Sequence, residues 1–120
     1  MKLTREARKD LALTVIAFGV LVLSIVRWWA NNALLGLVIL VQNLIALRIW
    51  HRRKNLLCFA TTAVIGTLAE LAFVASGAWA YANPTVLGLP FWFPLSFGQA
   101  GLLGYETVDL LAGHSTDATR

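Results

Sequence analysis

The chain has 120 residues, of which 58% are hydrophobic and only 13% are charged. This apolar share exceeds the roughly 45 to 50% of soluble domains. Together with a mean hydropathy of +0.70 it excludes a soluble globular protein and indicates an integral membrane protein. The net charge of +4 does not indicate a nucleic-acid partner, because the basic residues form two clusters beside apolar segments, where anionic lipid headgroups attract them.

The first apolar segment, residues 11–29, follows a basic N-terminal stretch. A transmembrane helix needs about 20 predominantly apolar residues, so we predict one span here, with its basic flank in the cytoplasm. A cleaved signal peptide is the competing interpretation. We disfavour it because no small-residue cleavage site follows the apolar core, where Arg27, Trp28 and Trp29 stand instead.

Two further spans are predicted before the middle loop. The second, residues 32–50, ends in the second basic cluster and therefore returns to the cytoplasm. The third, residues 56–79, leads outward again. It is followed by an uncharged connection that contains Asn83, Pro84 and Gly88, which are residues typical of loops.

The fourth predicted span, residues 91–111, has Pro90 just before it and Pro94 as its fourth residue. Proline is tolerated in the first turn of a helix but breaks its interior, so we expect the regular helix to begin near Pro94. Residues 112–120 are polar and form a short tail. The predicted fold is an all-α four-helix transmembrane bundle, a single membrane domain with both termini in the cytoplasm. We expect it in an inner (cytoplasmic) membrane.

Glu70 is the one acid within the predicted third span, and residues 71–105 after it contain no Asp, Glu, Lys or Arg. A charge at the centre of a membrane helix costs roughly 2.5 to 3.5 kcal/mol on insertion scales, so such an acid usually faces protein or water. The helical face of Glu70 favours protein, because most of its members are small and let a second helix approach closely. These members are Ala63, Gly66, Thr67 and Gly77, with Val74 as a bulkier exception.

The depth of Glu70 predicts its partners. With a rise of 1.5 Å per residue, Glu70 lies about 21 Å above the inner end of its span, level with Arg27 on the first span and Gln99 on the fourth. Gln42 and Asn43 lie one to two turns nearer the cytoplasm, and we predict that all five side chains form one polar network. Three roles for Glu70 stay open: a hydrogen bond between helices, a ligand or substrate contact, and a proton or cation relay.

The connection between the third and fourth spans is rich in aromatic residues, glycines and prolines. It contains the patterns G-x-W-x-Y-x-x-P, from Gly77 to Pro84, and G-x-P-x-W-x-P, from Gly88 to Pro94. With Glu70 before them, these patterns resemble small uncharacterised multi-span membrane proteins of prokaryotes and, more distantly, the multi-span proteins of carotenoid synthesis. The resemblance covers about residues 70–99. The acid-rich motif of small lycopene cyclases is not matched here.

Two interpretations of these rings remain. The first is a belt of aromatic side chains at the outer membrane boundary, together with a rigid turn. The second is a ring-lined pocket in the outer leaflet, suited to the tail of an isoprenoid, quinone or pigment. Its ligand-binding residues would be Glu70, Trp79, Tyr81, Trp92 and Gln99.

Acidic and histidine residues also lie near the predicted cytoplasmic surface. Glu106 and Asp109 are three residues apart, hence on one helical face, with His114 beyond them and His51 in the other cytoplasmic loop. The Glu-x-x-His motif of metal-binding bundles is absent, because Asp109 occupies the fourth position, so we predict no metal site. We expect the two acids to form exposed ion pairs, worth roughly 0 to 1 kcal/mol each, with Arg48, Arg52 or Arg53.

These features favour a non-catalytic protein: an accessory or structural subunit of a larger membrane assembly for pigments or electron transfer, with protein subunits or further copies as partners. One alternative is an isoprenoid-lipid binding protein or enzyme. In it, Glu70 would serve as the acid, and Trp79, Tyr81 and Trp92 would stabilise a cation. A bound carotenoid, quinone or lipid would suit that alternative. The other is a small proton-coupled exporter, although small multidrug exporters carry their essential acid on the first span.

Overall fold

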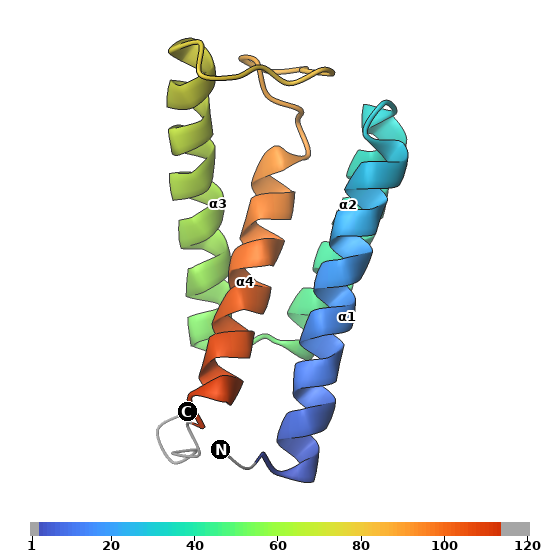
Figure 1. Cartoon of the computed structure of the whole chain (residues 1–120), viewed down its shortest axis with the longest axis vertical. Coiled ribbons are helices and arrows are strands. Elements are labelled where there is room, and N and C mark those ends of the chain that lie inside the picture. Colours follow the sequence, from blue (N-terminus) through green and yellow to red (C-terminus); the bar gives the residue numbers. More distant parts are fainter. Residues whose placement is uncertain (1–2, 114–120) are drawn as a thin grey trace.

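The computed structural model describes residues 3–113 and confirms the all-α prediction (Figure 1). The two ends of this part of the chain lie at the same end of the bundle. His114 and most of the predicted polar tail lie outside the described residues. The four helices are α1 (Arg5–Trp28), α2 (Asn32–Ile49), α3 (Arg53–Ala75) and α4 (Phe93–Leu111).

The four helices differ in apolarity and in burial. Within residues 3–113, α1, α2 and α3 are long and apolar enough to cross a membrane, and α4 falls short of that apolarity. The reason is visible in its position: α4 contacts all three other helices and buries Ser96, Gln99 and Glu106. Large apolar side chains of α1, α2 and α3 face outward instead. The less apolar α4 is the most buried of the four helices, although one side of it is open: Val108 is 65% exposed.

Glycines set the close approach of α3 and α4. A Cβ atom added to Gly66 would lie 2.5 Å from the ring of Phe97, and one added to Gly98 would lie 2.9 Å from the ring of Phe59. Gly101 is equally crowded, because a Cβ atom added to it would lie 2.5 Å from Thr62 Cβ. The sequence predicted a contact face on α3 that includes Gly66, and this glycine is buried against α4.

The connection between α3 and α4 crosses the end of the bundle and is tied to the α1–α2 turn (Figure 1). The helix α3 ends at Ala75, four residues before the predicted end of its span. The Trp92 indole donates to Asn32 Oδ1 at 2.8 Å, and the Asn32 amide donates to the Asn83 carbonyl at 2.7 Å. The Asn83 amide in turn donates to the Ala30 carbonyl at 3.1 Å.

Candidate functional site

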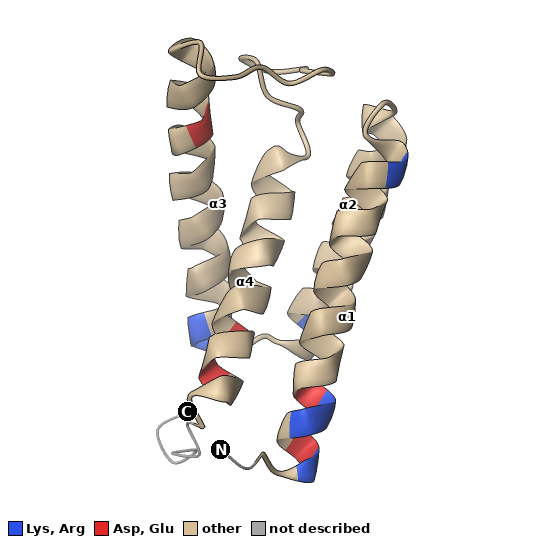
Figure 2. Ribbon diagram, viewed as in Figure 1, with Lys and Arg blue, Asp and Glu red and all other residues tan. Residues whose placement is uncertain are grey.

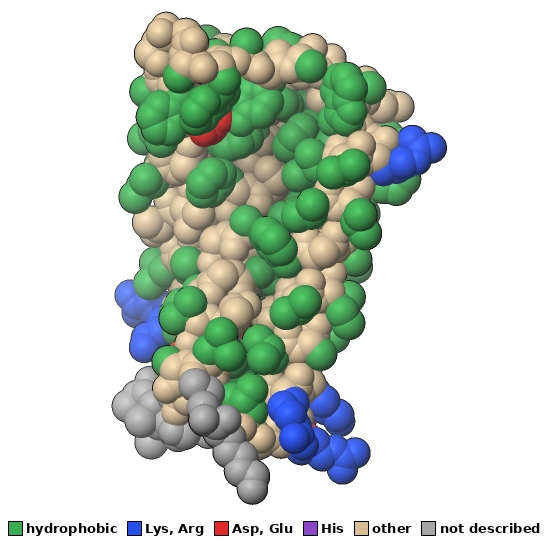
Figure 3. Space-filling model, viewed as in Figure 1, with side chains coloured by type: hydrophobic (Ala, Val, Ile, Leu, Met, Phe, Trp, Pro, Cys, Tyr) green, Lys and Arg blue, Asp and Glu red, His purple; other side chains and the backbone are tan. Residues whose placement is uncertain are grey.

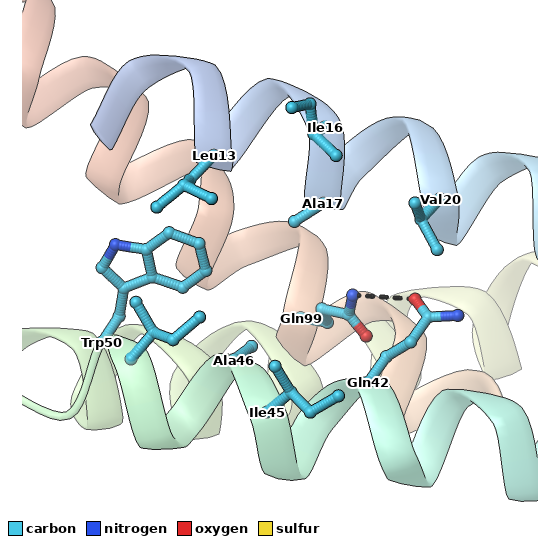
Figure 4. Close-up of a pocket in the computed structure, with 10 residues that line it drawn as sticks. Leu13, Ile16, Ala17, Val20, Gln42, Ile45, Ala46, Trp50 and Gln99 are labelled. Atoms are coloured by element: carbon cyan, nitrogen blue, oxygen red, sulfur yellow. Dashed lines mark hydrogen bonds between the residues drawn. The ribbon is translucent and has the colours of Figure 1, made fainter. Parts of the chain in front are cut away.

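A chain of amide side chains links α1, α2 and α4 in the middle of the bundle. The Gln42 amide donates to Ser24 Oγ at 2.9 Å, and the Gln99 amide donates to Gln42 Oε1 at 3.1 Å (Figure 4). The Asn43 amide donates to Gln99 Oε1 at 3.4 Å. Of the five predicted network members, the structure thus brings together Gln42, Asn43 and Gln99, and Ser24 completes the chain.

The other two predicted members, Arg27 and Glu70, lie elsewhere. The Arg27 guanidinium lies 6.0 Å from the ring centre of the neighbouring Trp28. In the view of Figure 2, the basic position near the end of α1 and the acidic position of α3 lie on opposite sides of the bundle. The predicted partners of Glu70 are therefore not the ones that the structure gives it. The prediction compared only the depths of these side chains along the membrane normal, and equal depth does not determine which helices are neighbours.

An apolar cavity of about 220 Å³ lies between α1 and α2, beside the amide chain (Figure 4). Gln42 and Gln99 border it on one side, and Trp50 borders it on the other. Trp50 is 5% exposed, and its indole Nε1 is one of three buried polar atoms without a hydrogen-bond partner in the described part of the chain. The others are Asn43 Oδ1 and Thr67 Oγ1. Trp50 belongs to a hydrophobic core cluster with Ala46, Leu102 and Leu103.

Glu70 has its own partners, which come from the connection after α3. The Trp79 indole donates to Glu70 Oε1 at 3.0 Å, and the Tyr81 hydroxyl donates a short hydrogen bond to the same oxygen. We call Glu70, Trp79 and Tyr81 the Glu70 site. Since α3 ends at Ala75, Glu70 lies only about 8 Å from the end of its helix at 1.5 Å per residue. The acid is therefore close to the boundary where hydrocarbon would meet headgroups, and not at the centre of a span.

The second carboxylate oxygen of Glu70 is open. Within residues 3–113, Oε2 neither accepts a hydrogen bond nor is fully buried, and Glu70 takes part in neither of the two ion pairs. Figure 3 shows an acidic patch at the surface beside the upper part of α3, framed by hydrophobic side chains. The carboxylate is thus fixed on one side by two neutral donors and accessible on the other.

Aromatic rings extend the Glu70 site on both sides. The rings of Phe73 and Trp79 are 5.2 Å apart, and those of Tyr81 and Phe93 are 6.0 Å apart in an edge-on arrangement. Trp79 is 49% exposed. Burial raises the pKa of the Tyr81 hydroxyl above its usual value, and the hydrogen bond to Glu70 and its negative charge raise that pKa further. The hydroxyl therefore stays a donor across the physiological pH range.

Trp92 and Gln99, the other two predicted ligand-binding residues, are not part of the Glu70 site. Trp92 is 6% exposed and holds the α1–α2 turn through its indole, and Gln99 belongs to the amide chain. The sequence did not identify Asn32, which accepts from Trp92, or Asn83, which links Asn32 to the α1–α2 turn. The signal that could have found them is their type, since an amide in an apolar chain must find a hydrogen-bond partner.

At the opposite end of the bundle, the predicted pairing of the two acids with an arginine is confirmed. Arg52 donates to Glu106 through a short ion pair and to Asp109 at 3.4 Å, and Asn55 donates to Glu106 at 2.7 Å. The expected exposure was wrong: Glu106 is 1% exposed. Partial burial lowers the pKa of Arg52, but the hydrogen bonds and charges of Glu106 and Asp109 outweigh it and raise the pKa above its usual value.

Comparison with known proteins finds no relative of this chain: it matches no known protein family, no curated protein and no solved structure. The local chemistry of the described residues is therefore the basis for a functional proposal. Among residues 3–113, no group of three His, Cys, Asp or Glu side chains could hold a metal ion.

Proposed function

We propose that this integral membrane protein binds a lipid-like ligand at the Glu70 site. One observation carries the proposal: a carboxylate within an apolar helix keeps one oxygen accessible, while two donors from the next connection fix the other. Ionisable residues inside membrane helices are costly and usually functional.

The position of the site suits an amphipathic ligand. Glu70 is about five residues from the end of α3, near the expected boundary between hydrocarbon and headgroups. An exposed ring lies below it on the same side: Phe97 of α4 is 38% exposed and lies against Gly66, one turn before Glu70 on the same face of α3. A polar head could contact Glu70 and the rings while its tail lies along Phe97. Phe73 and Trp79 would cover the head from the side.

Gentle extraction from native membranes followed by native mass spectrometry tests this proposal. We expect the wild-type protein to retain one class of lipid-like molecule and the Glu70→Gln variant to lose it. The Glu6→Gln variant is the matched control, because it makes the same change of charge at an exposed position of α1. Recovery of the same molecules from all three proteins would contradict a role for the Glu70 site.

A second candidate is the accessory or structural subunit of a larger membrane assembly. It is supported by α3, which packs mainly on α4 and leaves large apolar side chains such as Leu57 and Val64 exposed. Another membrane helix could cover this face as well as lipid could. The same mass spectra test the candidate, because a stoichiometric protein partner that persists in Glu70→Gln would favour it over ligand binding.

A further inference from the structure

We infer that the ligand of the Glu70 site carries a cationic ammonium head. This inference rests on the proposed function and adds the chemical class of the ligand. The two donors to Glu70, an indole and a phenol, are both neutral. Neither ion pair of the described residues involves Glu70. The carboxylate thus has no counter-charge within this part of the chain.

The open oxygen narrows the choice of ligand. A carboxylate oxygen only accepts hydrogen bonds. Quinone carbonyls are also acceptors, and a carotenoid hydrocarbon has no polar group, so neither complements Glu70 Oε2. An alcohol could donate one hydrogen bond but would leave the negative charge uncompensated. An ammonium group supplies the missing positive charge, and a primary ammonium supplies donors as well.

The rings beside Glu70 favour the same class. A cation is attracted to the faces of Trp, Tyr and Phe rings within about 6 Å, and aromatic cages recognise quaternary ammonium groups. Trp79 stands next to the carboxylate, is half exposed and packs at 5.2 Å against Phe73. Its indole N–H donates to Glu70 Oε1 at 3.0 Å. Carboxylate and ring are therefore adjacent, as a cation site requires.

The test uses the protein with 5-fluorotryptophan at its five tryptophans, in neutral detergent micelles. Fluorine NMR follows the Trp79 resonance, which the Trp79→Phe variant assigns. The probes are dodecyltrimethylammonium, dodecylammonium and dodecanol, which share one tail. We expect both ammonium probes to shift the Trp79 resonance in a saturable way and to bind about tenfold more tightly than dodecanol. In Glu70→Gln this preference should disappear, whereas Glu6→Gln should keep it.

The outcomes separate the inference from the proposed function. If dodecanol binds as tightly as the ammonium probes and all three lose affinity in Glu70→Gln, the site binds amphipaths but the cationic class is wrong. If no probe moves the Trp79 resonance, both proposals are wrong. Unchanged resonances of the other four tryptophans show that Glu70→Gln is folded.

Bicelles separate the two sources of an ammonium head. A shift with phosphatidylethanolamine but not with phosphatidylglycerol supports a lipid headgroup. A shift with the free ammonium probes alone supports a free amphipathic cation. Either result agrees with the ammonium class. A shift with phosphatidylglycerol but with none of the ammonium-bearing molecules would overturn it.

Discussion

Substitution of Gly101 by alanine tests whether the close approach of α3 and α4 holds the bundle together. The added Cβ would lie 2.5 Å from Thr62 Cβ and 2.6 Å from Thr62 Cγ2. Non-bonded carbons are normally 3.5 to 4.0 Å apart, so the helices must separate locally by about 1 Å. Thr62 Cβ is attached directly to the backbone, which means that a rotation of its side chain cannot relieve the clash.

The expected loss of stability follows from two opposing effects. Overpacking typically lowers the free energy of unfolding by about 1 to 3 kcal/mol. The higher helix propensity of alanine over glycine raises the free energy of unfolding by up to about 1 kcal/mol and opposes this loss. Gly104→Ala is the matched control, because nothing lies within 4 Å of its added Cβ. We therefore expect Gly101→Ala to be destabilised and Gly104→Ala to be unchanged or slightly stabilised.

Unfolding in mixed micelles with increasing sodium dodecyl sulfate, followed by circular dichroism, measures this difference. The only cysteine adds a local measurement, since Cys58 Sγ donates to the Gly101 carbonyl at 3.3 Å. Its alkylation by N-ethylmaleimide should be faster in Gly101→Ala. The double variant with Thr62→Gly should recover part of the loss. Equal stabilities of Gly101→Ala and Gly104→Ala would refute the packing argument.

Three further predictions concern hydrogen bonds and charge. Because the pKa of Tyr81 is raised in the folded protein, the hydroxyl's contribution to stability is complete below pH 10 and is lost as the pH rises further. In a Tyr105→Phe protein, where Tyr81 is the one remaining tyrosine, no tyrosinate absorbance should appear at pH 10 until the protein is unfolded. Glu106→Gln should lower the free energy of unfolding by about 1 to 3 kcal/mol and Asp109→Asn by less than about 1, in the same detergent titration. Trp92→Phe removes the donor to the half-buried Asn32 Oδ1 at the start of α2, so it should lower the free energy of unfolding by about 0.5 to 1.5 kcal/mol and speed proteolysis between α3 and α4.

Much of the fold could be predicted because hydrophobic length and proline position are local signals. The four apolar segments became four helices, and α4 begins at Phe93 with Pro94 in its first turn. The end of α3 was harder to predict. Residues 76–79 are uncharged and continue the apolar pattern, but Gly77 adopts a φ of +84° and ends the helix.

The partners of Glu70 could not be predicted in the same way. Depth alone cannot tell which helix lies beside which, and Gln99 faces α2 instead of α3. The pocket interpretation grouped Trp79 and Tyr81 with Glu70, but their direct hydrogen bonds to it could not be predicted, because they require the chain to turn back after Gly77. Burial of Glu106 was missed for a related reason: the carboxylate is near the end of a helix, yet this face of α4 packs against the other helices.

The most direct measurement of the central claim is labelling with a membrane-soluble carbodiimide at mildly acidic pH, with the modified carboxyl groups located by peptide mass spectrometry. An accessible Glu70 oxygen predicts that Glu70 is modified much faster than Glu106, which is 1% exposed and held by Arg52 and Asn55. An ammonium probe should protect Glu70 from the reagent. A Glu70 that stays unmodified, or that reacts no faster than Glu106, would contradict the account.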